Sequence, residues 1–223
     1  MRSIITKMLF MITFLYLSPQ APVPVHKEPR HQVKLENPYV RVLDVNFPPG
    51  YTTLFHTHAN DNVAICINGG KLRSERLSEQ PSDTVAATGR ASFAKASYTH
   101  RITNTGEAAL QFIDVEILSL MGTPKSTLSR EKTTGQEVIL DNERVRIYRI
   151  TLEPGQATDV FTYELHGLSV VVSPAKMQIE MPKQKAQTED FKPGTFRWHE
   201  GSIKQSLKNV GQTKFEAIDI ELK

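Results

Sequence analysis

The residues best suited to chemistry in this sequence are three histidines, His56, His58 and His100. The first two are two positions apart. Alternate side chains of a β-strand point to the same face, so this spacing directs both imidazoles to one side of a sheet. Neutral imidazoles that converge on one point suit a borderline transition metal. The sequence therefore predicts a metal site, with His100 as the third candidate ligand.

Short β-strands are the elements expected to position these histidines. Apolar and polar residues alternate through the body of the chain, and no stretch there keeps a 3.6-residue apolar period. Besides the runs V-K-L and V-R-V-L-D-V-N-F, strands are predicted at 51–57, 62–68, 71–76, 91–96, 99–104 and 109–118. The expected fold class is all-β.

The segment from Gly50 to Gly69, which contains the His56-x-His58 pair, resembles the first sequence motif of the cupin superfamily. Cupins usually have a metal-binding glutamate after the pair, and Asn62 occupies that position here. The fourth ligand therefore stays open.

A second segment is similar to the second cupin motif, G-x5-P-x-G-x2-H-x3-N. Gly89, His100 and Asn104 fit its spacing without a gap. Lys95 replaces the proline of the motif, and Ser97 replaces its second glycine.

The resemblance implies a double-stranded β-helix, or jelly-roll, barrel with His56, His58 and His100 as metal ligands. Asn62 or Asp61 is the candidate for a fourth ligand. Some cupin dioxygenases, including the cysteine dioxygenase type, use three histidines alone.

The second half of the chain repeats the first at a constant shift of 105 residues, which predicts two barrels in tandem. N-P-Y-V-R-V falls on N-E-R-V-R-I, and I-D-V-E falls on I-D-I-E. The three histidines fall on Phe161, Tyr163 and Gln205, none of which is a good ligand for a transition metal. The second half thus keeps the fold pattern without the imidazoles. This contrast indicates that the histidines serve chemistry, not packing.

The predicted organisation has five parts. They are a signal peptide at 1–21, a proline-rich lead-in at 22–30, a first barrel with the metal site at 31–118, a linker at 119–135, and a second barrel that has lost the ligands at 136–223. The barrels are expected to pack against each other or to be joined flexibly.

The N-terminus is typical of an export signal. Arg2 and Lys7 precede an apolar run at 8–17 that is too short to span a bilayer, and Pro22 leaves the cleavage site uncertain. We expect a periplasmic or secreted protein without a transmembrane span after signal removal. An uncleaved N-terminal anchor is the alternative. Next to the signal, His26 and His31 are expected to be solvent-exposed.

Composition excludes several classes of partner. The net charge is +3, and no basic cluster is interleaved with aromatic residues, so nucleic-acid binding is not expected. Cys66 is the single cysteine, which excludes an internal disulfide framework and leaves a core residue or a pocket-lining thiol. The expected partner is a small-molecule substrate or ligand, and a homodimer is an open alternative to a monomer.

The resulting functional hypothesis is a metal-dependent dioxygenase that acts on a small organic molecule. The expected cofactor is one divalent transition metal, with iron first and manganese, nickel or zinc as alternatives. Competing hypotheses are a non-catalytic binding or accessory protein, and a metal-dependent isomerase or lyase.

Overall fold

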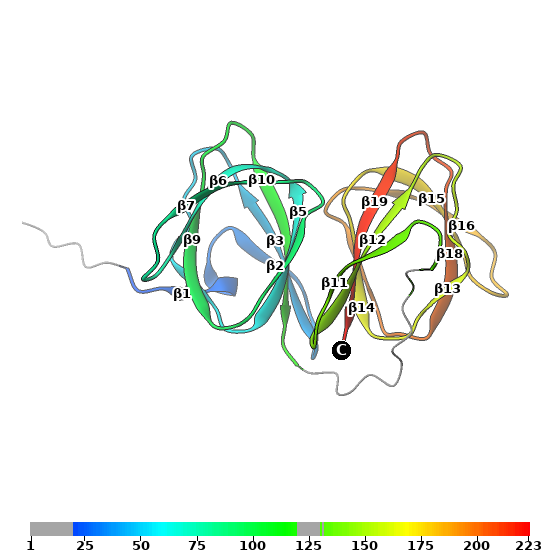
Figure 1. The fold of residues 1–223 in the computed structure, drawn as a ribbon, viewed down its shortest axis with the longest axis horizontal. Coiled ribbons are helices and arrows are strands. Elements are labelled where there is room, and N and C mark those ends of the chain that lie inside the picture. The colour runs from blue at the N-terminus through cyan, green and yellow to red at the C-terminus, as the bar shows by residue number, and fades with distance from the viewer. Residues whose placement is uncertain (1–19, 120–129, 131) are drawn as a thin grey trace, which may run out of the picture.

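The computed structural model describes residues 20–119, 130 and 132–223, which form two β-barrels side by side (Figure 1). The predicted signal peptide, except for its last two residues, and most of the predicted linker lie outside the described residues. No helix among the described residues is long and apolar enough to cross a membrane.

The first barrel consists of two five-stranded sheets, with strand orders β1-β4-β9-β6-β7 and β2-β3-β10-β5-β8. Its elements are β1 (Val23–Pro24), the 3-10 turn η1 (Val25–Lys27), β2 (His31–Glu36), β3 (Val40–Phe47), β4 (His56–His58), β5 (Asp61–Asn68), β6 (Gly70–Arg76), β7 (Ser82–Ala86), β8 (Ala91–Ala94), β9 (Tyr98–Asn104) and β10 (Leu110–Ile117).

The second barrel has a five-stranded sheet, β11-β12-β19-β14-β17, and a four-stranded sheet, β13-β18-β15-β16. Its strands are β11 (Gln136–Asp141), β12 (Val145–Leu152), β13 (Phe161–Tyr163), β14 (Gly167–Val171), β15 (Ala175–Glu180), β16 (Gln187–Phe191), β17 (Phe196–His199), β18 (Ile203–Asn209) and β19 (Phe215–Leu222). The all-β prediction of two tandem jelly-roll barrels is confirmed.

The internal repeat extends to hydrogen bonds that the two barrels make at equivalent positions. Asn104 Nδ2 donates to the carbonyl oxygen of Phe47 at 2.9 Å, and Asn209 Nδ2 donates to that of Leu152 at 3.0 Å. Both asparagines are fully buried, and each joins the end of one strand to another strand of its barrel. The shared turn and core positions therefore reflect one fold built twice.

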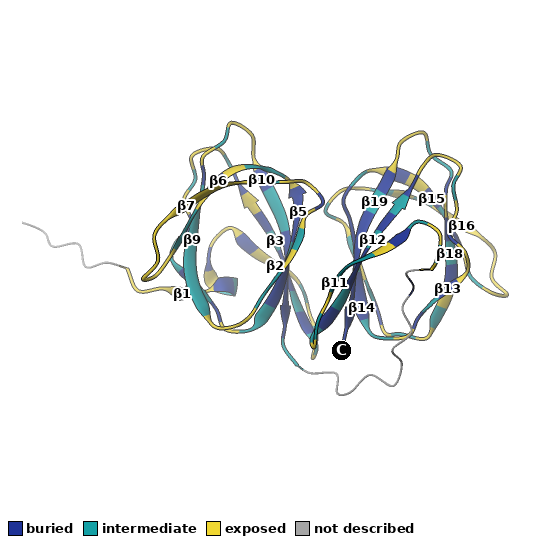
Figure 2. Cartoon of the chain, viewed as in Figure 1, coloured by how far each residue is buried: buried dark blue, intermediate teal, exposed yellow. Residues whose placement is uncertain are grey.

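The barrels pack through the sheet β2-β3-β10-β5-β8 of the first barrel and the sheet β11-β12-β19-β14-β17 of the second. A single apolar cluster contains residues of both barrels, such as Val42 and Ile65 from the first and Ile147 and Ile220 from the second. Figure 2 shows buried residues along the strands nearest this junction. Of the two expected arrangements, the barrels adopt the packed one.

Ion pairs cross the junction at the edge of the apolar cluster. Arg144 Nε lies 2.8 Å from Asp61 Oδ2, and Lys95 Nζ lies 2.9 Å from Glu143 Oε1. The Lys95 and Glu143 side chains are mostly exposed, whereas those of Arg144 and Asp61 are largely buried. The pair between Arg144 and Asp61 therefore contributes more to fixing the relative position of the barrels.

Two strand predictions differ from the structure. The strand expected at 51–57 begins only at His56, after the irregular segment that follows Gly50 (φ +74°). β7 was not predicted, because S-D-T-V-A lacks an apolar alternation. This strand pairs with β6 alone at a sheet edge, and four of its five residues are exposed.

Candidate metal centre

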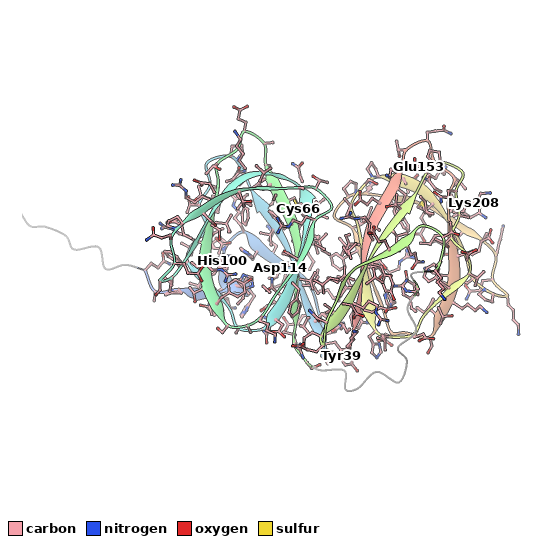
Figure 3. The ribbon with its side chains drawn as sticks, viewed as in Figure 1. Tyr39, Cys66, His100, Asp114, Glu153 and Lys208 are labelled. Atoms are coloured by element: carbon pink, nitrogen blue, oxygen red, sulfur yellow. The ribbon has the colours of Figure 1, made fainter. Side chains whose placement is uncertain are left out.

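The three histidines come from two adjacent strands of the first barrel. β4 and β9 are antiparallel, and His56 pairs directly with His100. The two-residue spacing turns His56 and His58 to the same side, where both are buried, at 0% and 2% exposure. Figure 3 labels His100 in the first barrel. The structure thus brings the predicted residues together.

The donor atoms fit a mononuclear metal. One nitrogen from each histidine lies within 4.8 Å of the others. His58 Nε2 and His100 Nε2 are 3.1 Å apart, close to the roughly 3 Å expected for two nitrogens that share a metal at about 2.1 Å. His56 Nδ1 is 2.9 Å from the carbonyl oxygen of Leu54, which assigns the proton to Nδ1 and leaves Nε2 with a free lone pair. His56 Nε2 is buried without a hydrogen-bond partner.

Burial keeps the three imidazoles neutral. It lowers the pKa of His56 to about 4, of His58 to about 3 and of His100 to about 2, and the neighbouring imidazoles add to each effect. A neutral imidazole is the form that binds a metal. At neutral pH the cluster is therefore ready to coordinate without first losing protons.

A polar layer lies behind His58, whose Nδ1 has no hydrogen-bond partner. Asp114 Oδ2 lies 3.6 Å from His58 Nδ1, and burial raises the pKa of Asp114 to about 6, against the effect of a hydrogen bond from Asn62. Asn62 Nδ2 donates to Asp114 Oδ1 at 2.7 Å, and Asn62 Oδ1 accepts from the Tyr98 hydroxyl at 3.0 Å. Asn62, expected as a candidate fourth ligand, is thus engaged on both sides of its amide and positions Asp114.

Asp61, the other candidate fourth ligand, lies elsewhere. Its carboxylate accepts from the backbone N–H of Ala96 at 2.8 Å and pairs with Arg144 of the second barrel at 2.8 Å. The cluster of metal-ligating groups found among the described residues contains only the three histidines.

His31 was expected to be exposed, and this expectation is wrong. His31 is 6% exposed, and its ring lies 4.5 Å from that of His56. Its Nδ1 is 2.7 Å from Oε2 of Glu28, a carboxylate that is itself buried. The lead-in folds over the barrel because β1 pairs with β4. His31 begins β2 and is held at the site by its pairing with Val45 of β3.

The site opens into a small cavity of about 140 Å³. Its apolar lining includes Val45, Phe47, Ala64, Ile102 and Phe112, and its polar lining includes His31, His58, Asn62, Tyr98, His100 and Asp114. Cys66 is a buried core residue outside this lining, and burial raises the pKa of its thiol to about 11. The cavity suits a small, partly apolar organic molecule.

Sequence reasoning missed Asp114 as a member of the site. The available signal was its place in the apolar strand Q-F-I-D-V-E-I, where an acidic residue faces the barrel interior. Charged residues are rarely buried without a partner, so such a position points to a functional or structural pairing.

The second barrel holds a guanidinium where the first holds imidazoles. Arg130 is 6% exposed, and its Cζ lies 5.1 Å from the ring centre of Phe161 and 4.8 Å from that of Tyr163. Its Nη2 donates at 2.6 Å to Asp219, the counterpart of Asp114. This buried cation lies within the predicted linker and carried no recognisable signal in the sequence.

Replacing Asp114 with asparagine is expected to weaken metal binding about 10- to 100-fold, the usual effect of losing a carboxylate behind a ligating histidine. The measurement is metal affinity by competition with a chelator. Asp83→Asn, at an exposed ion pair, is the control. Equal affinities for the two variants would contradict a supporting role for Asp114.

Neither protein-family models nor curated proteins gave a match to this chain. Solved structures gave several. AerE from Microcystis aeruginosa has a TM-score of 0.60 at 14% identity, with 91% of this chain and 98% of that chain covered. An oxalate decarboxylase has a TM-score of 0.57 at 13% identity, with 86% and 74% covered.

Salicylate 1,2-dioxygenase from Pseudaminobacter salicylatoxidans has a TM-score of 0.59 at 11% identity, with 86% of this chain and 76% of that chain covered. At these identities the likeness establishes a shared fold across both barrels. Activity has to be argued from the site itself.

Proposed function

We propose, from the premise that this chain is a two-barrel protein of the cupin superfamily, that its first barrel is a metal-dependent enzyme centre. One divalent transition metal would be held by His56, His58 and His100. The observation that carries the proposal is the convergence of three neutral imidazoles, two of them buried and one partly buried, on one point beside a small cavity. Such a ligand set leaves coordination positions open, as a catalytic metal requires.

The favoured reaction is the oxygenation of a small organic molecule by dioxygen. Iron is the first choice of metal, and an iron(II) ion in this site would supply the redox chemistry that couples dioxygen to the substrate. The shared fold with salicylate 1,2-dioxygenase supports this choice by analogy. The fold shared with oxalate decarboxylase keeps lyase chemistry as the alternative.

The residues around the cavity would orient the substrate. Glu28 lies 2.7 Å from His31 Nδ1 and fixes the orientation of this ring, which lines the cavity. Phe47 and Phe112 supply apolar walls that exclude water. The cavity therefore favours a small substrate with an apolar body and a polar group.

The test is the metal content of protein purified without chelator or nickel resin, read by elemental mass spectrometry. About one equivalent of iron, with oxygen consumption on adding small carbonyl compounds or thiols, is the expected result. One equivalent of zinc, nickel or manganese without oxygen uptake would favour isomerase or lyase chemistry. Absence of metal after reconstitution would overturn the proposal in favour of a non-catalytic binding protein.

Export to the periplasm or the medium is part of the proposal, and it rests on the charged and apolar pattern of residues 1–21. Mass spectrometry of the same preparation reads the N-terminus. A chain that begins near Pro22 supports export, and a chain that retains Met1 contradicts cleavage. Homodimer formation stays an expectation.

A further inference from the structure

The second barrel encloses a cavity of about 280 Å³, twice the volume of the cavity beside the histidines. We propose that this cavity is a second binding site, for a small neutral organic molecule with an apolar body and one hydroxyl, carbonyl or amide group. The proposal does not depend on metal binding or catalysis in the first barrel.

The cavity exists because of a specific difference between the two halves. Ala217 lines the second cavity at the repeat position at which Phe112 lines the first. A methyl group thus stands where the other barrel has a phenyl ring. The walls around Ala217 are otherwise apolar and include Ile150, Val171, Leu207 and Phe215. This lining would bury the apolar body of a ligand.

One region of the lining is polar and has hydrogen-bonding capacity. Tyr163 and Gln205 occupy the repeat positions of His58 and His100, and both are at least nine-tenths buried. The Tyr163 hydroxyl is 3.3 Å from Gln205 Nε2 and 3.3 Å from Ser169 Oγ. These bonds are at the long end of the hydrogen-bond range, so a ligand oxygen or N–H can replace one of them at little loss.

The buried cation near this polar region already faces two carboxylates, which disfavours an anionic ligand. Behind it, the Arg130 guanidinium pairs with Asp219 at 2.6 Å and with Glu221 at 3.1 Å. A buried carboxylate ligand would therefore enter without Arg130 as a free cation to pair with. Burying an unpaired charge is strongly unfavourable.

The cavity has a route to solvent between β16 and β17. Asp190 and Arg197 line it and are exposed, and Arg197 Nη2 donates to Glu189 Oε2 at 2.7 Å. The Glu189 and Arg197 side chains are 37% and 55% exposed, so this pair is accessible to water. Because exposed charged residues line one side of the cavity, it is open to solvent there and is not an enclosed packing defect.

The experiment is ¹⁹F NMR titration of the full chain with 4-fluorophenol and 4-fluorobenzamide, beside 4-fluorobenzoate and fluorobenzene. We expect saturable binding of the first two with a Kd of about 1 mM or tighter, and weaker binding of the anion and of the unsubstituted ring. Failure of both neutral polar probes to bind would overturn the proposal. Preferential binding of the benzoate would overturn the assignment of a neutral ligand.

Two variants locate the binding. Ala217→Phe should abolish it by filling the cavity. Gln205→Leu should weaken the phenol and benzamide about tenfold and leave fluorobenzene unchanged. If Ala217→Phe does not fold, Gln205→Leu alone decides, and an unchanged affinity there overturns the proposal. His58→Ala is the control from the other barrel, and loss of probe binding in it would place the probe in the first cavity and overturn the assignment.

Discussion

Replacing His56 or His100 with alanine abolishes metal binding at the first barrel and leaves the fold intact. Each substitution removes one of the three donors that converge within 4.8 Å. Loss of a supporting group alone commonly lowers metal affinity 10- to 100-fold, so loss of a ligand should lower it by more than about 100-fold. Metal per chain after dialysis gives the readout, with circular dichroism to verify folding.

Gln205→Ala is the matched control, because Gln205 takes the repeat position of His100 in the barrel without histidines. This variant should keep the wild-type metal content. If either histidine variant kept the wild-type amount of metal per chain, the proposed metal centre would be wrong. The oxygenase proposal would then be wrong as well.

Replacing Arg130 with methionine lowers the free energy of unfolding by about 3–5 kcal/mol, the range found when one partner of a buried ion pair is removed. The substitution keeps most of the side-chain volume but leaves Asp219 and Glu221, 0% and 3% exposed, without their guanidinium. Urea denaturation at pH 7 measures the loss.

Arg73→Met is the matched control, since Arg73 pairs with Asp83 at 2.7 Å on the surface. An exposed pair of this kind contributes about 0–1 kcal/mol. If Arg130→Met cost no more than this control, the guanidinium would not be the stabilising cation of the second barrel.

Lowering the pH should reduce the difference in the free energy of unfolding between the wild type and Arg130→Met. Burial by itself would raise the pKa of Asp219, but Arg130 and His199 together outweigh burial and hold this pKa at about 2. The folded-state pKa lies below the unfolded value of about 3.9, so the wild-type stabilisation is present above that value. This stabilisation is lost from the wild type as the pH falls towards 2. The variant lacks the part of it that comes from Arg130, so the variant loses less.

The strand pattern, the tandem repeat and the three histidines could all be predicted from the amino-acid sequence. Each depends on local information. A period of two determines which face His56 and His58 share, and a constant shift between the halves aligns turns and core positions. The loss of imidazoles at Phe161 and Tyr163 was readable for the same reason.

The partners of the histidines were decided by tertiary structure alone. Asp114 lies near His58 although its strand is more than fifty residues away, and His31 lies beside His56 because β2 pairs with β3. Arg130 enters the second barrel from outside its strands. Strand order and register determine such contacts, and these are global properties that no local period encodes.

Sequence by itself therefore determined the fold class, the two halves and the three candidate ligands, because side-chain alternation and internal repetition are written along the chain. Only the folded barrels decided what surrounds those ligands and what fills the second barrel. The ion pairs of Arg130 and the space beside Ala217 arise where distant strands meet, and close packing determines both.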